Sequence, residues 1–202
     1  MLDSFDINPT EQVRRVLGSV ACAMRVCAES TEHKIVIRQF EKEISSAQPK
    51  ANLAAIHTTP NMLDTACDTG LSKSLIEVGG HLPWTDSPRT PKMRNRIAVC
   101  SFNDMYHLEH HIAGLLYMEP NLAYPEHAHA PPELYFTLSG IAEWRYGGSK
   151  AYETVSAGNL LHNDPLDLHG VHSKETSLLS FFLLWGTELS TLKRDLSKLN
   201  TQ

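Results

Sequence analysis

One stretch decides the fold: Tyr124-Pro125-Glu126-His127-Ala128-His129-Ala130-Pro131-Pro132-Glu133-Leu134-Tyr135. It places His-x-His four residues ahead of Glu133, and Gly140 follows that glutamate by seven residues. Residues two apart on a β-strand share a face, so His127 and His129 can point into one cavity. Burying two imidazoles and a carboxylate is costly unless they bind something, and this donor set suits a divalent transition metal. The stretch therefore predicts a metal site.

Length and composition restrict the class of protein. A chain of 202 residues, 42% of them hydrophobic, fits one domain or one domain with a helical extension. The net charge of −5 and the lack of a basic stripe argue against a nucleic-acid partner. No apolar run approaches the roughly 20 residues of a membrane span, and the N-terminus lacks the pattern of a signal peptide. We therefore expect a cytoplasmic protein that acts on a small molecule, without nucleic-acid or membrane partners.

Cysteine and histidine are distributed differently. The cysteines are scattered without C-x-x-C spacing, which indicates buried or free thiols in a reducing compartment: Cys22, Cys27, Cys67 and Cys100. Histidine is abundant, at 11 residues, and several lie near the opening stretch. His107, His110 and His111 stand beside Glu109 on a turn before a strand-like run, where we expect them to be exposed to solvent.

Residues 1–80 are expected to form an N-terminal helical region. Asn8-Pro9-Thr10-Glu11 has the residues of a helix start, and apolar residues follow at helical spacing: Val13, Val16, Leu17, Val20 and Met24. A second helix is expected over about 31–46, with Ile35, Phe40 and Ile44 turned inward. A weaker third helix is expected near 61–77, ending at Gly79-Gly80.

Residues 81–202 are expected to form a β-barrel domain that closes with a short helix. Five strand-like runs are separated by turns rich in Gly, Pro and Asn: 97–102, 112–118, 133–138, 141–146 and 178–185. Many short strands of this kind predict a mainly β sandwich or barrel. The last segment, 188–199, has Leu189, Leu192 and Leu196 on one helical face.

The spacing H-x-H-x(3)-E-x(6)-G resembles the first motif of the cupin superfamily, which implies a jelly-roll barrel of the double-stranded β-helix type. The second cupin motif supplies one further histidine from a later strand. Registered on Gly158, that histidine is His169, with His162 and His172 as rivals. The match departs from the usual pattern where Asp164 and Leu166 replace Pro and Gly, and where Asn121 replaces a Gly before the first motif.

A narrower resemblance is to the cupin-type dimethylsulfoniopropionate (DMSP) lyases and their lyase-like relatives. The shared pattern is Y-P-x-H-x-H-x-x-x-E-x-Y over residues 124–135, and it continues through the segments 138–140, 143–145, 157–162 and 184–185. The resemblance covers residues 80–186 well and the helices in outline. Departures at Ala128, Tyr146 and Asn159 leave the metal site intact and put the substrate in doubt.

The resemblance implies a β-elimination of DMSP to dimethyl sulfide and acrylate, with the substrate carboxylate on the metal. Its metal ligands, carried over, are His129, Glu133, His169 and in some members Tyr135. His127 is a ligand in a generic cupin and a substrate-side group in the lyase interpretation. One divalent metal per chain is implied, and the ligands suit Zn, Fe, Mn, Ni or Co.

A tyrosine is the expected general base. Its ordinary pKa of about 10 makes tyrosine a poor base unless a cation lowers that value, as a bound metal would. Tyr124 and Tyr135 are the candidates, and we prefer Tyr124 because Tyr135 is also a candidate ligand. Aromatic faces can hold the cationic sulfonium by cation–π contact, for which Trp185, Trp144, Tyr117 and Tyr146 are available.

Two other functions compete with the lyase interpretation. A cupin metalloenzyme of another reaction, such as an isomerase or dioxygenase acting on a small carboxylate, has the same metal motif, since fold does not fix function. A non-enzymatic small-molecule-binding cupin is the other, although the N-terminal helices lack the basic recognition helix of a DNA-binding sensor. A homodimer is compatible with either, because cupins often dimerise.

Overall fold

The computed structural model describes residues 8–50 and 70–192. Helices come first: α1 (Pro9–Cys27), α2 (Thr31–Ser46) and α4 (Gly70–Val78), followed by the short 3-10 turn η1 (Gly79–His81). Asn8 caps α1 by accepting a hydrogen bond from the Thr10 amide, and Ser30 caps α2 by accepting one from the His33 amide. The first part of the third expected helix, residues 61–69, lies outside the described residues. No helix of the described ranges is long and apolar enough to cross a membrane.

The inner face of the helical hairpin is apolar, with one departure from expectation. In α1 the predicted residues Val13, Leu17, Val20 and Met24 are fully buried. In α2 the prediction for Ile35 was wrong, because its side chain is 48% exposed. The buried face of α2 instead follows the spacing Val36, Ile37, Phe40 and Ile44, which leaves Ile35 one position outside the apolar stripe.

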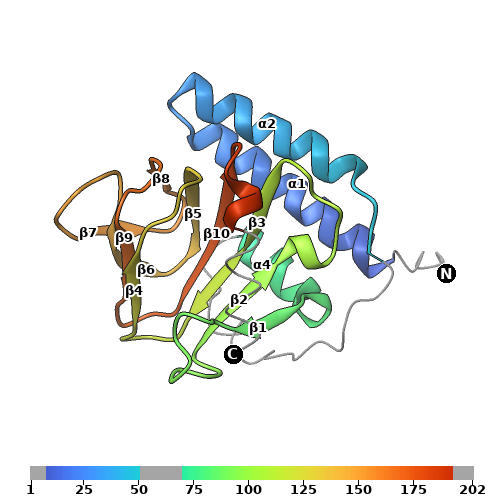
Figure 1. The fold of residues 1–202 in the computed structure, drawn as a ribbon. Coiled ribbons are helices and arrows are strands. Elements are labelled where there is room, and N and C mark those ends of the chain that lie inside the picture. The colour runs from blue at the N-terminus through green and yellow to red at the C-terminus, as the bar shows by residue number, and fades with distance from the viewer. Residues whose placement is uncertain (1–7, 51–69, 193–202) are drawn as a thin grey trace.

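Within the described residues, ten strands form two antiparallel sheets, whose arrangement is shown in Figure 1. The larger sheet has the order β1-β2-β3-β10-β5-β8 and the smaller sheet the order β4-β9-β6-β7. The bounds are β1 (Trp84–Asp86), β2 (Ile97–Ser101), β3 (His111–Met118), β4 (Ala123–His127), β5 (Glu133–Ser139), β6 (Ile141–Arg145), β7 (Glu153–Ser156), β8 (Leu160–Asn163), β9 (His169–Ser173) and β10 (Leu178–Trp185). A short 3-10 turn, η2 (Phe102–Asp104), separates β2 from β3. A helical turn at residues 189–192 follows β10, where the description ends.

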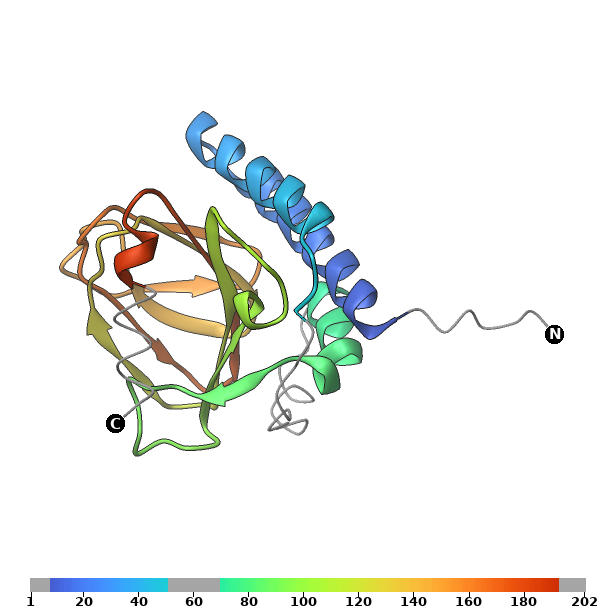
Figure 2. The ribbon, with the colours of Figure 1, turned by 45° about the vertical axis from the view of Figure 1, so that its right-hand side comes forward.

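The predicted β-sandwich with N-terminal helices and a short C-terminal helix is confirmed. All five strand-like runs of the sequence are strands, as β2, β3, β5, β6 and β10. The larger sheet has a layer on each face (Figure 2): the helices cover one side, and the barrel interior lies on the other. Neighbouring residues of β3 show the two sides, because Tyr117 packs with the helices and Leu116 packs inside the barrel.

The described cysteines agree with the expectation of buried or free thiols. Cys22 and Cys27 are free and exposed, and Cys100 is free and buried in the core of β2. Cys27 lies at the end of α1 and donates to the Gly158 carbonyl at 3.4 Å, which joins the helical hairpin to the barrel.

Candidate metal centre

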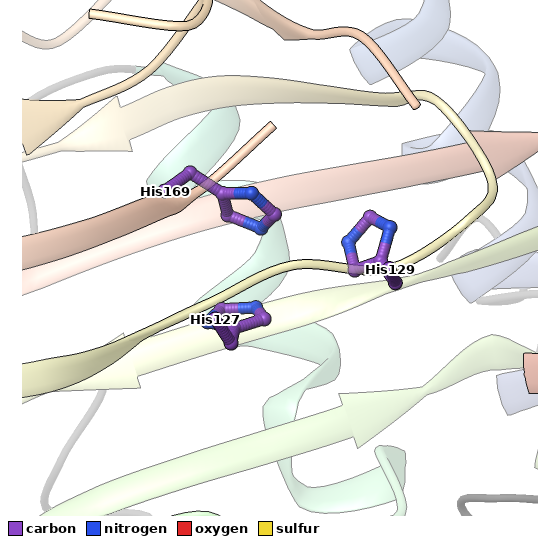
Figure 3. Close-up of side chains that lie close together, drawn as sticks. All are labelled: His127, His129 and His169. Atoms are coloured by element: carbon purple, nitrogen blue, oxygen red, sulfur yellow. The ribbon is translucent and has the colours of Figure 1, made fainter. Parts of the chain in front are cut away.

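Three histidine side chains converge at one end of the smaller sheet (Figure 3). His127 is the last residue of β4 and His169 the first of β9, and the two face each other as paired residues of the antiparallel ladder. Their ring centroids are 4.2 Å apart, and that of His129 lies 4.9 Å from His169. One ligand nitrogen from each of the three lies within 4.8 Å of those of the other two.

His129 reaches this cluster from a loop and not from the strand. Strand β4 ends at His127, so the simple alternation that suggested a shared strand face does not place His129. Instead, the loop is held by the Leu166 amide, which donates to the His129 carbonyl at 2.9 Å. The shared cavity was predicted correctly, but the local geometry behind that prediction was wrong.

Backbone carbonyls orient all three rings in the same way. The Nδ1 atoms lie 2.9 Å from Pro125 O for His127, 2.8 Å from Pro131 O for His129 and 2.8 Å from Asp167 O for His169. A nitrogen this close to a carbonyl oxygen donates its proton, so the other ring nitrogen, Nε2, carries the lone pair. Metal-binding histidines are held in this manner in proteins, which makes Nε2 the ligand atom of each ring.

Glu133 completes the donor set from the first position of β5. Its Oε2 atom lies 3.2 Å from Nε2 of His129 and 3.2 Å from Nε2 of His169. The His169 contact lacks hydrogen-bond geometry, so this buried nitrogen has no hydrogen-bond partner in the described part of the chain. A buried ring nitrogen whose lone pair has no partner needs an explanation. A metal ion bound by these four residues would supply one.

The charges at the cluster suit a cation. Burial works to raise the pKa of Glu133, but its contacts with His129 and His169 outweigh burial and hold the pKa at about 2. Burial lowers the pKa of His127 to about 4, and the charges of His169 and Arg89 add to that effect. At neutral pH the site therefore offers an ionised carboxylate and a neutral imidazole, the protonation states that metal binding requires.

Both candidate tyrosines lie beside the cluster. The Tyr124 ring stands edge-on to His127, with centroids 5.5 Å apart, and the Ser87 hydroxyl donates to its phenol oxygen at 3.3 Å. The Tyr135 hydroxyl bonds to Glu133. Burial raises the pKa of each tyrosine above its ordinary value. Neither phenol is ionised by these protein groups alone.

A cavity of about 780 Å³ opens onto these groups. Its inner end is lined by Tyr124, Tyr135, His127, His129 and Glu133. Apolar walls come from the inward faces of β3 and β10, at Ile112, Leu116, Phe182 and Leu184. The outer part is polar and carries Lys50, Asp104 and Glu109, among others. Such a volume is typical of small-molecule sites.

The sequence and the fold were compared with those of known proteins. Residues 107–180 match the family model of dimethylsulfoniopropionate lyase. The crystal structure of the DMSP lyase DddQ from Ruegeria pomeroyi DSS-3 superposes with a TM-score of 0.69 at 17% identity, over 87% of this chain and 92% of that chain. This likeness shows that the chain has the same cupin fold. The structure described as DMSP lyases RdDddP and RnDddQII gives a TM-score of 0.62 at 17% identity, over 86% of this chain and 96% of that chain. No curated protein matches the sequence.

Four aromatic residues were candidates for the sulfonium contact, and none of them lines this cavity: Trp185, Trp144, Tyr117 and Tyr146. Tyr117 faces the helices from β3, while its neighbour Leu116 lines the cavity. Trp185 likewise follows the cavity residue Leu184 on β10 and packs on the outer side against His33 and His162. Trp144 is buried inside the barrel beneath the Tyr135 ring, 4.9 Å away between centroids, and supports that ring without lining the cavity.

The structure also shows where the alternative ligands His162 and His172 lie, and where the histidines of the turn before β3 lie. His162 stacks on Trp185 outside the barrel, and His172 stacks on Tyr152 with ring centroids 4.3 Å apart, so neither joins the cluster. His111 was expected to be exposed and is instead 2% exposed, because its Nδ1 lies 2.6 Å from Glu43 Oε2. His107 lines the outer part of the cavity.

Sequence reasoning missed residues of the loop between β1 and β2. Ser87 and Arg89 both lie at Tyr124, and Arg89 lines the cavity. The segment Ser87-Pro88-Arg89-Thr90-Pro91 is visible in the sequence as a turn signal. Nothing in its composition indicates that the turn lies over Tyr124, 37 residues after Ser87 in the chain. The fold alone brings them together.

Proposed function

We propose that this protein is a metal-dependent lyase that cleaves DMSP by β-elimination to dimethyl sulfide and acrylate. One observation carries the proposal: a histidine and carboxylate donor set and a buried tyrosine share one cavity of small-molecule size. The match of residues 107–180 to the DMSP lyase family supports the choice of reaction.

The donor set is assigned to a metal and the tyrosine to the proton. His129, His169 and Glu133 would hold a divalent transition metal, with His127 at its side as a further ligand or a substrate contact. When bound, such a metal supplies a Lewis acid for the substrate carboxylate and a positive charge that favours the tyrosinate form. Tyr135 bonds to Glu133 and supports that ligand, which leaves Tyr124 as the base.

Tyr124 is better placed than Tyr135 to take a proton. Its phenol oxygen accepts from the Ser87 hydroxyl, and the positive charge of Arg89 acts on it; both favour the anion. The hydroxyl of Tyr135 instead bonds to a carboxylate, which favours the protonated phenol. Tyr124 removes the proton from the carbon next to the carboxylate, the carbon–carbon double bond forms, and the carbon–sulfur bond breaks. The electron pair of the broken carbon–sulfur bond leaves with the sulfur atom, which gives neutral dimethyl sulfide.

The apolar walls suit the sulfonium end of the substrate. The Phe182 and Tyr135 rings line the cavity and contact each other edge-on, with centroids 6.3 Å apart. An aromatic face attracts a desolvated cation by about 0.5–2 kcal/mol. Because sulfur leaves without charge, that attraction ends with the reaction and the neutral product is released.

Headspace gas chromatography tests the proposal directly. Purified protein loaded in turn with Zn, Fe, Mn, Ni or Co is incubated with DMSP, and dimethyl sulfide and acrylate are quantified. We expect equal amounts of the two products with at least one metal, and a loss of both after chelation. A rate equal to that of buffer with every metal would refute the lyase assignment, and metal content measured on the same samples separates that result from a failure to load.

A further inference from the structure

Arg89 lies at the inner end of the cavity without a carboxylate partner. It lines the same space as Tyr124, His127 and Glu133 and is only partly exposed. Within the described part of the chain, no carboxylate lies within 4.0 Å of its guanidinium. Two acids that line the same cavity already have partners, because Asp86 pairs with Arg94 and Glu133 contacts His129 and His169.

The loop that carries Arg89 is fixed by buried hydrogen bonds. Ser87 is 1% exposed; its hydroxyl oxygen accepts from the Arg89 amide at 3.3 Å, and its carbonyl accepts from the Thr90 amide at 3.1 Å. The same hydroxyl donates to Tyr124, so loop and barrel are joined at this residue. Pro88 and Pro91 restrict the backbone further. The base of the Arg89 side chain is therefore held in a constant position relative to Tyr124.

The guanidinium is directed at the reacting end of the cavity. Its charge acts on the Tyr124 hydroxyl and on the imidazoles of His127 and His129. A guanidinium has five N–H donors with which to bind an anion. Its flat edge matches the two oxygens of a carboxylate, which is why arginine is the usual residue for binding that group. A cation in a partly desolvated cavity is stabilised when a ligand supplies the missing anion.

We propose that Arg89 is a carboxylate-binding residue of this cavity and selects small carboxylate substrates by holding that end beside Tyr124. The inference rests on the proposed function only for the identity of the substrate, since it concerns the anionic end that DMSP shares with other small carboxylates. A carboxylate held there places the adjacent carbon next to the Tyr124 oxygen. The positive charge of Arg89 also disfavours the reverse orientation, in which a sulfonium would face it.

Anion binding without turnover is the first test. Isothermal titration calorimetry measures propionate against the purified protein, as isolated and after chelation, with propionamide as the uncharged analogue. We expect the wild type to bind propionate in both forms, though more weakly after chelation because the proposed metal contacts the same carboxylate, and to bind propionamide at least tenfold more weakly than propionate. Arg89→Gln should weaken propionate binding at least tenfold and Arg89→Lys by a smaller factor. Arg94→Gln removes the same charge from the same loop at a side chain that is 77% exposed, and should stay within twofold of wild type.

The outcomes separate this inference from the lyase assignment. Propionate affinity equal to wild type in both Arg89 variants, or complete loss of binding in the chelated wild type, would overturn the role of Arg89. Where lyase activity is present, Arg89→Gln should raise KM for DMSP at least tenfold with unchanged metal content; an altered kcat alone would indicate a structural role. Arg89-dependent propionate binding in a protein that releases no dimethyl sulfide would refute the lyase assignment and retain the carboxylate site.

Discussion

Glu43 joins the N-terminal helices to the loop that walls the cavity, and its substitution gives a quantitative test of the fold. This α2 residue accepts from the Glu109 amide at 2.6 Å and the His110 amide at 2.9 Å, and its Oε2 lies 2.6 Å from His111 Nδ1. Its side chain is 13% exposed and that of His111 is 2% exposed. The neighbouring Glu109 lines the cavity, so the contact links helix, loop and site.

Glu43→Gln keeps the shape of the side chain and removes its charge. Hydrogen bonds to a charged group contribute about 1.5–3 kcal/mol each, against about 0.5–1.5 kcal/mol for neutral ones. The two amides belong to exposed residues that water can reach, so we assign them a loss of about 0.5 kcal/mol each and the buried His111 bond about 1 kcal/mol. The expected loss is about 2 kcal/mol, or roughly 4–8 °C in Tm for a chain of this size.

The pH dependence has a defined sign. Burial works to raise the pKa of Glu43, but the bonds from His110, His111 and Glu109 outweigh it and the pKa is lowered. Burial also lowers the pKa of His111, against the opposing effect of Glu43. Both groups bind protons more readily in the unfolded chain, so stability falls as pH decreases, first below about 6.5 for His111 and then below about 4.5 for Glu43. The difference between wild type and Glu43→Gln should therefore narrow below pH 4.5.

Urea unfolding followed by circular dichroism measures these free energies at pH 7, 5.5 and 4. Glu41→Gln is the matched control, since Glu41 lies on the same helix and makes one partly exposed ion pair, with Arg25 at 3.7 Å. Such a pair contributes about 0–1 kcal/mol. If Glu43→Gln costs no more than Glu41→Gln at pH 7, the assignment of Glu43 as the anchor of the cavity wall is wrong.

Three further substitutions test the site and its framework. Tyr124→Phe should retain metal and lose at least about 100-fold in kcat, as expected for removal of a general base; near-normal dimethyl sulfide release would shift the role to Tyr135. His169→Gln should lose bound metal by elemental analysis while His172→Gln, which alters the outward neighbour on β9, retains it; equal loss in both would contradict the ligand assignment. Gly140→Ala should cost about 3 kcal/mol in chemical unfolding, from a φ of +85° and a Cβ placed 2.0 Å from the Ser177 carbonyl oxygen. Gly158→Ala, with a φ of +86° and open space, should cost about 1 kcal/mol, and similar values for the two would refute the steric argument.

The sequence predicted the large sheet better than the small one, for a physical reason. Strands β3, β5 and β10 are buried on both faces, so each is an apolar run that stands out in the sequence. The strands of the small sheet are short. Strands β4, β6 and β7 are partly exposed, and β9 is mostly buried but contains a single large apolar residue, Val171, among His, Gly and Ser. Such a segment has no hydrophobic pattern of its own. It becomes a strand because β4 and β6 pair with it on either side.

The continuous burial that revealed β3 and β10 also concealed which residues face the site. Alternation identifies the inward face of a strand only when the other face is polar, and here the helices cover the outer face with apolar residues. Tyr117 and Leu116 are therefore equivalent in the sequence, although one lies under the helices and the other lines the cavity.

Motif spacing does not depend on burial, because it counts positions along the chain. Such spacing identified His127, His129, Glu133 and His169 in the sequence. Leu166 shows the limit of spacing: it stands where the cupin motif has Gly, and its φ of +67° lies in the left-handed region that glycine favours. Arg89 lay beyond both methods, because a loop has no periodicity and its place over Tyr124 follows from sheet closure alone.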